Sequence, residues 1–82
     1  MITASQLRAA RSLLGLSQPE VAAAAGIPTM TLKRAEGTGK PAASKDAIEA
    51  ISAALEAAGV EFIPENGGGA GVRLRRNENG SG

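Results

Sequence analysis

The chain has 82 residues, carries nine Lys and Arg against eight Asp and Glu, and contains no Cys, His, Trp or Tyr. A chain of this length forms one small domain that buries about 60% of its unfolded surface, so a partner subunit would add to its stability. The lack of Cys and His excludes disulfides, thiolate nucleophiles and the common zinc sites and general bases, so we expect no enzyme, no metal site and no cofactor.

The sequence has no stretch of about 18 apolar residues and does not begin with a basic segment followed by an apolar signal core. We therefore expect a cytoplasmic protein that does not contact a membrane.

The charge of the chain is unevenly distributed: residues 1–45 carry six basic and two acidic side chains (net +4), residues 46–66 carry five acidic ones (net −5), and residues 67–82 carry three basic and one acidic (net +2). A basic first half favours a polyanionic partner.

The first predicted helix runs from about Thr3 to Leu14. Thr3 and Gln6 have the spacing of a capping box, and Gly15 follows as a left-handed cap. Three apolar residues form the inward stripe of this helix: Leu7, Ala10 and Leu14.

The second predicted helix starts at Ser17 and ends before Gly26. Ser17 and Glu20 form another capping box. We expect three residues of this helix to face inward: Val21, Ala24 and Ala25.

The third predicted helix covers about Pro28 to Glu36 and is followed by a loop from Gly37 to Pro41. Its inner side is formed by Leu32 and Ala35. Four residues are predicted on its outer side: Thr29, Met30, Lys33 and Arg34.

A fourth helix is predicted from about Ser44 to Ala58, with Ile48, Ile51 and Leu55 at core spacing. Beyond Gly59 the apolar period changes from 3.6 to 2 residues, which predicts strands at 60–63 and 71–75 joined by a glycine-rich turn.

A lone two-stranded hairpin is marginal in water, so this one must pack on the helices or extend across a dimer. Its apolar residues are the candidates for dimerisation: Val60, Phe62, Val72 and Leu74. Residues 77–82 are polar and glycine-rich, and we expect them to be disordered.

Residues 17–37 have the pattern of a helix-turn-helix. Small side chains at Ala22 and Ala25 allow two helices to approach closely, Gly26 permits a positive φ at the turn, and Ile27 fills the angle between the helices. Such an arrangement leaves the second of these helices able to enter a DNA major groove.

The chain resembles the lambda-repressor-like (Xre) family of bacterial and phage regulators over about residues 3–58. The matching segments are Gly15-Leu16-Ser17-Gln18, Glu20-Val21-Ala22, Gly26-Ile27, Thr31-Leu32 and Arg34-Ala35-Glu36. The expected fold is mainly α: a bundle of four helices with a C-terminal β-hairpin. We expect residues 1–59 to bind DNA, 60–76 to form the hairpin and 77–82 the tail.

The resemblance also implies roles for single residues. Gln18 matches a side chain that contacts the DNA backbone, and Arg11 and Glu36 match a partly buried ion pair. Positions that face bases or phosphates correspond to Thr29, Met30, Lys33 and Arg34, and we add Lys40 in the following loop. Pro28 departs from the family's usual Ser or Thr cap, and Ala35 is smaller than the usual Ile or Leu.

These observations predict a sequence-specific DNA-binding regulator that acts as a repressor, binds a palindromic operator as a homodimer and takes no small-molecule ligand. The alternative is an antitoxin or anti-regulator whose hairpin holds a protein partner. Two interpretations stay open for Arg73, Arg75 and Arg76, which either grip phosphates or keep an edge strand soluble.

Overall fold

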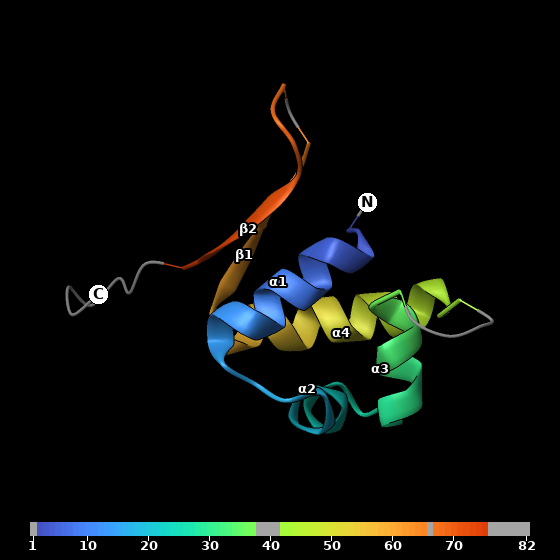
Figure 1. Ribbon diagram of the computed structural model, residues 1–82. Coiled ribbons are helices and arrows are strands. Elements are labelled where there is room, and N and C mark those ends of the chain that lie inside the picture. Colours follow the sequence, from blue (N-terminus) through green and yellow to red (C-terminus); the bar gives the residue numbers. More distant parts are fainter. Residues whose placement is uncertain (1, 38–41, 66, 76–82) are drawn as a thin grey trace.

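The computed structural model describes residues 2–37, 42–65 and 67–75 (Figure 1). The described chain is mainly helical and ends in a two-stranded antiparallel sheet, as the sequence predicted. Its elements, in chain order, are α1 (Ala4–Leu14), α2 (Gln18–Ala25), α3 (Thr29–Ala35), α4 (Lys45–Ala58), β1 (Val60–Ile63) and β2 (Gly71–Leu74). The predicted disordered tail, residues 77–82, lies outside the described residues, as do residues 38–41.

Two capping boxes begin α1 and α2. The Thr3 hydroxyl accepts from the Gln6 backbone N–H at 3.2 Å, and the Gln6 side chain accepts from the Thr3 N–H at 2.9 Å. Ser17 and Glu20 make the same reciprocal pair at 3.2 and 2.8 Å. Both helices end at a glycine in the left-handed region, which confirms the predicted starts and stops of these two elements.

The core lies where α1, α2, α3 and α4 meet the first strand. Six side chains in it are almost fully buried, and each contributes about 1.5–3 kcal/mol relative to exposure: Leu7, Val21, Leu32, Ile51, Leu55 and Val60. The inward stripes predicted for α1, α3 and α4 supply four of these six residues. Two other residues of those stripes, Leu14 and Ile48, are only half-buried.

The inward face predicted for α2 is partly wrong. Ala24 is exposed and Ala25 is half-buried, whereas Ala22 is 2% exposed. On a 3.6-residue helix Ala25 and Ala22 lie to one side of Val21, and Ala24 lies about 60° to its other side. Because α2 ends in four consecutive alanines, composition could not distinguish these positions, and the packing of α2 against α3 and α4 decided between them.

The hairpin forms within one chain and packs on the helices. Its register pairs Val60 with Leu74 and Phe62 with Val72. The second strand ends at Leu74, one residue earlier than predicted, although the Arg75 N–H still donates to the Gly59 carbonyl at 2.7 Å. Figure 1 shows the hairpin leaving the helices beside α1, on the side away from α2 and α3.

Candidate nucleic-acid interface

The helix-turn-helix is formed by α2 and α3, joined at Gly26. Gly26 has φ +72°, a conformation that favours glycine. The next residue, Ile27, donates its backbone N–H to the Ala22 carbonyl at 3.0 Å and packs its half-buried side chain against the core. In Figure 1, α2 is seen end-on while α3 is seen from the side, so the two helices are not parallel.

Pro28 precedes α3 with φ −65° and no side-chain cap, because the proline ring fixes φ and offers no side-chain acceptor in place of the family's Ser or Thr. Leu32 is 0% exposed and Ala35 is 6% exposed, so they fix the inner side of α3 to the core. The opposite side is therefore turned outward.

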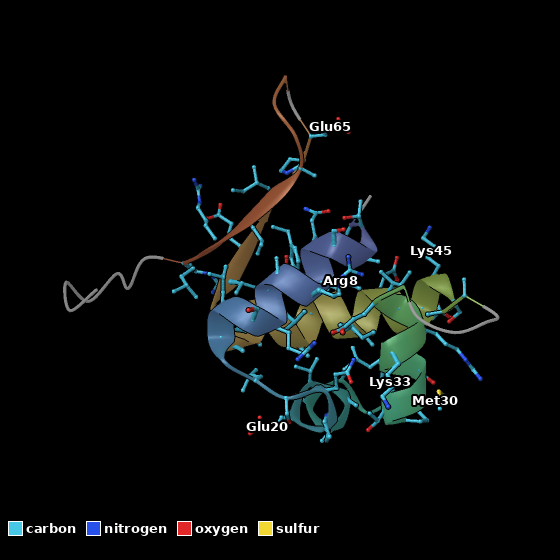
Figure 2. The ribbon with its side chains drawn as sticks, viewed as in Figure 1. Arg8, Glu20, Met30, Lys33, Lys45 and Glu65 are labelled. Carbon is cyan, nitrogen blue, oxygen red and sulfur yellow. The ribbon has the colours of Figure 1, made fainter. Side chains whose placement is uncertain are left out.

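The outer face of α3, which we call the recognition face, consists of Thr29, Met30, Lys33 and Arg34. Met30 is 55% exposed and Lys33 is exposed, whereas Thr29 and Arg34 are half-buried. Figure 2 shows Met30 and Lys33 on α3, at the opposite end of the molecule from Glu65 in the hairpin loop. The structure thus brings all four predicted base-contacting residues onto one short helix. Lys40, the fifth, lies outside the described residues.

Glu36 follows α3 and joins three helices through its carboxylate. Arg11 on α1 donates from Nε to Oε2 at 2.8 Å and from Nη2 to Oε1 at 3.1 Å. The Glu36 hydrogen bond raises the pKa of Arg11 above its ordinary value. Glu36 is only 2% exposed, so an unpaired carboxylate here would be costly, and Arg11 supplies the compensating charge.

Gln18, the residue expected to contact the DNA backbone, is the first residue of α2 and is half-buried. Its Nε2 donates to Oε1 of Glu36 at 3.0 Å. The structure thus places Gln18 at the start of α2 with its amide held by a residue 18 positions further along the chain.

Three residues have structural roles that sequence reasoning missed. Arg8 donates to the backbone carbonyl of Glu36. Gln6, 5% exposed, donates from Nε2 to the carbonyls of Gly71 at 2.9 Å and Ile63 at 3.3 Å and so ties α1 to both strands. Arg75 donates from Nη2 to the Glu56 carbonyl at 2.6 Å, which satisfies the end of α4. Of these three residues, only Gln6 has a local sequence signal. That signal is its capping box with Thr3, and it does not predict the contacts with the strands.

The arginines of the hairpin are turned to their own chain. Arg73 pairs with Glu61 at 3.0 Å across the sheet, and this pair lowers the pKa of Glu61. Arg75 donates to the Glu56 carbonyl at the end of α4. These contacts favour a structural role over a phosphate contact for both Arg73 and Arg75. Arg76 lies outside the described residues.

The four dimerisation candidates differ in exposure. Val60 is 0% exposed and belongs to the core of its own chain, so it is not available to a partner. Phe62 and Val72 are half-buried, and Leu74 is 52% exposed. Leu74 is therefore the hairpin residue best placed to meet another protein.

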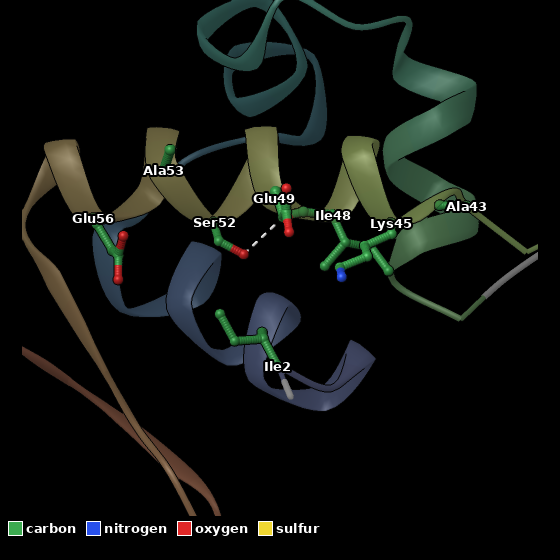
Figure 3. A pocket seen from close by; sticks show the side chains of 8 residues that line it. All are labelled: Ile2, Ala43, Lys45, Ile48, Glu49, Ser52, Ala53 and Glu56. Carbon is green, nitrogen blue, oxygen red and sulfur yellow. Dashed lines mark hydrogen bonds between the residues drawn. The ribbon is translucent and has the colours of Figure 1, made fainter.

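A groove of about 740 Å³ lies between Ile2 and one face of α4 (Figure 3). Half of its lining residues are aliphatic, among them Ile48, and the others are polar or charged: Lys45, Glu49, Ser52 and Glu56. The Ser52 hydroxyl donates to the Ile48 carbonyl at 2.7 Å, so this donor is already satisfied within α4. The groove is formed without any residue of α2 or α3, and it is separate from the recognition face.

Within the described ranges, no three His, Cys, Asp or Glu side chains gather as a metal-binding group. No helix in that part of the chain is long and apolar enough to cross a membrane.

A comparison with protein families matches residues 4–62 to a model described as a helix-turn-helix domain. The match covers most of the chain, from the start of α1 to within β1. It is consistent with the resemblance to lambda-repressor-like regulators. A comparison with curated proteins found no match.

Proposed function

The chain belongs to the helix-turn-helix domain family, and from this premise we propose that it is a sequence-specific DNA-binding regulator whose recognition helix is α3. The observation that carries the proposal is the recognition face. Two basic side chains, Lys33 and Arg34, lie on it beside the exposed Met30, and Leu32 anchors the helix from behind. A short helix held in this way fits the major groove of DNA.

The side chains of the recognition face have the chemistry that base edges require. Lys33 and Arg34 donate to guanine O6 and N7, Thr29 bonds a base edge or a phosphate, and Met30 packs against a thymine methyl group. Gln18, at the start of α2, donates to a phosphate and so positions α3 without distinguishing bases.

We further propose that the protein acts as a homodimer on a palindromic operator. Seven residues of helix span only about 10 Å, so one α3 contacts few base pairs, and a twofold dimer doubles the site. The exposed Leu74 on β2 supports the hairpin as the dimer contact. Occupancy of the operator excludes other proteins from the same DNA, which makes repression the expected outcome.

Selection of bound sequences from a random pool of duplex DNA tests this proposal. The wild-type protein is expected to enrich one sequence repeated as two inverted half-sites, and a Lys33→Ala, Arg34→Ala double variant is expected to enrich none. Failure of the wild type to enrich any sequence would contradict specific DNA binding. Enrichment of a single half-site would contradict the palindromic operator alone.

The second candidate is a protein-interaction module, an antitoxin or anti-regulator that holds its partner through the hairpin. The observation in its favour is that Leu74 is exposed on an element that leaves the helices on the side away from α3. Co-purification of a distinct protein that is lost in Leu74→Lys, together with no DNA affinity at moderate salt, would establish this function instead.

A further inference from the structure

We infer that Glu36 is a positioning residue for DNA binding, because it sets the orientation of the Gln18 amide toward a phosphate. The inference rests on the proposed function. Glu36 follows the recognition helix, Gln18 begins α2, and Nε2 of Gln18 lies 3.0 Å from Oε1 of Glu36.

The chemistry of the two groups decides which way the amide faces. An ionised carboxylate only accepts hydrogen bonds, so Glu36 must face the NH2 end of the Gln18 amide and not its oxygen. That NH2 group has two N–H bonds, and Glu36 takes one of them. The second N–H is the donor that a phosphate oxygen requires.

Glu36 is itself held in place from two sides. Arg11 makes two hydrogen bonds to its carboxylate, at 2.8 and 3.1 Å, and Arg8 donates to its backbone carbonyl. Glu36 is also nearly inaccessible to solvent. The carboxylate therefore has one fixed position, and Gln18 takes its orientation from it.

Arg11 compensates the negative charge that Glu36 places behind Gln18. A lone carboxylate behind Gln18 would repel an approaching phosphate, but the guanidinium compensates it at contact distance. Because the charge of Glu36 is compensated, what Glu36 contributes to the phosphate contact is the orientation of the Gln18 N–H. The same network ties the start of α2 to the end of α3, so the backbone contact and the recognition helix move together.

A double-mutant cycle on DNA affinity tests the inference. Glu36→Gln keeps the size of the side chain but lets the Gln18 amide bind in either orientation, because the new amide both donates and accepts. We expect this variant to weaken binding about fivefold, the magnitude of one net hydrogen bond, and equally for specific and random DNA. In the Glu36→Gln background, Gln18→Ala is expected to cost at most half of what it costs in the wild type.

Glu49→Gln is the matched control. It makes the same change in charge at an exposed position on α4, away from the recognition face. Because it removes one negative charge, it is expected to leave DNA affinity unchanged or slightly raised. A loss in Glu36→Gln is therefore opposite in sign to the effect of charge alone.

Thermal unfolding of each variant sets a temperature at which all are folded. Nuclear magnetic resonance of the wild-type side-chain amide provides a measurement that needs no variant. Of the two Nε2 protons of Gln18, one is expected to be protected from exchange in the free protein, and both are expected to be protected on DNA.

Three results would overturn the inference. They are additive losses in the cycle, tighter DNA binding by Glu36→Gln, or equally fast exchange of the two Gln18 Nε2 protons in the free protein. If the wild type bound no DNA at all, the proposed function would fail and the inference with it, whereas specific binding with additive losses would overturn the inference alone.

Discussion

At the scale of single residues, Glu36 and Lys33 illustrate two different kinds of contribution. Glu36 is buried and makes its contacts within the protein, through Arg11 and Gln18. Lys33 is exposed on the recognition face, one turn after Met30. We therefore expect substitutions at Glu36 to change stability and the affinity for all DNA sequences, and substitutions at Lys33 to change sequence preference.

Lys33→Ala and Arg34→Ala are each expected to cost about 1–3 kcal/mol of binding to the selected operator if the residue makes a bidentate base contact. Each change should also relax the preference at one position of the operator. Gln18→Ala is expected to weaken binding to all sequences alike, because a phosphate contact carries no base information. Gel-shift titrations on the operator and on random DNA measure both effects. Unchanged affinity in all three variants would show that the recognition face is wrongly assigned.

At the scale of elements, the helices begin with local hydrogen bonds that the sequence predicted. The boxes of α1 and α2 have the same geometry but differ in charge, because Gln6 is neutral and Glu20 is ionised. The hydrogen bond from the Ser17 N–H, and then that from its hydroxyl, lowers the pKa of Glu20 below its ordinary value. The stability that the α2 box contributes should therefore depend on pH, whereas that of the neutral α1 box should not.

Because the pKa of Glu20 is lower in the folded state, its charge stabilises the fold above the ordinary Glu pKa, and this contribution is lost as the pH falls through the lowered value. Glu20→Gln is therefore expected to be less stable than the wild type at neutral pH, with the difference disappearing in acid. Thr3→Ala, in the neutral box, is expected to lose about 1 kcal/mol at both pH values. Urea unfolding at neutral and at acid pH measures the stability of each variant. A stability difference between Glu20→Gln and the wild type that is the same at both pH values would contradict a stabilising role of the Glu20 charge.

The hairpin depends on Gln6, whose side chain bonds the carbonyls of Ile63 and Gly71. Gln6→Leu keeps the volume but leaves both carbonyls without this donor, so we expect it to cost about 2 kcal/mol. Amide hydrogen exchange should speed up most in β1 and β2. Thr3→Ala, which removes the capping box and keeps the Gln6 side chain, should leave hairpin exchange close to that of the wild type. Equal acceleration in all elements would contradict a specific role in docking the hairpin.

At the scale of the whole molecule, α3 and the hairpin lie on different sides of α1 and α4 (Figure 1). The basic first half includes α3, while the acidic side chains of residues 46–65 are all exposed. A protein with this distribution is oriented by the field of DNA with its basic part toward the phosphates. In the proposed homodimer, the hairpin then faces away from the DNA.

Leu74→Lys is expected to shift the protein toward monomer, since it places a charge on a large apolar residue of β2 that is exposed. Binding to the palindrome should weaken more than binding to a single half-site. Sedimentation measures the oligomeric state, and Leu13→Lys is the matched control, because Leu13 on α1 is 46% exposed. Equal effects of the two variants would argue against the hairpin as the dimer contact.

Much of the fold could be predicted because its signals are local. Capping boxes, terminal glycines and the apolar period each act within four or five residues, and they located the starts and ends of α1 and α2 and the inner side of α3. The alanines of α2 carry no such signal, which is why Ala24 was misplaced. The candidate site was predicted residue by residue from the family resemblance, and its DNA contacts stay predictions.

The sequence by itself determined where the helices and strands lie and which side chains form the outer face of α3. Tertiary structure alone decided that Gln18 meets Glu36, that Gln6 holds both strands 57 and 65 residues away, and that Arg75 satisfies the end of α4. The reason is that a polar side chain has several possible partners of equal chemistry along the chain. The packing of the core selects among them by fixing which atoms come within hydrogen-bond distance.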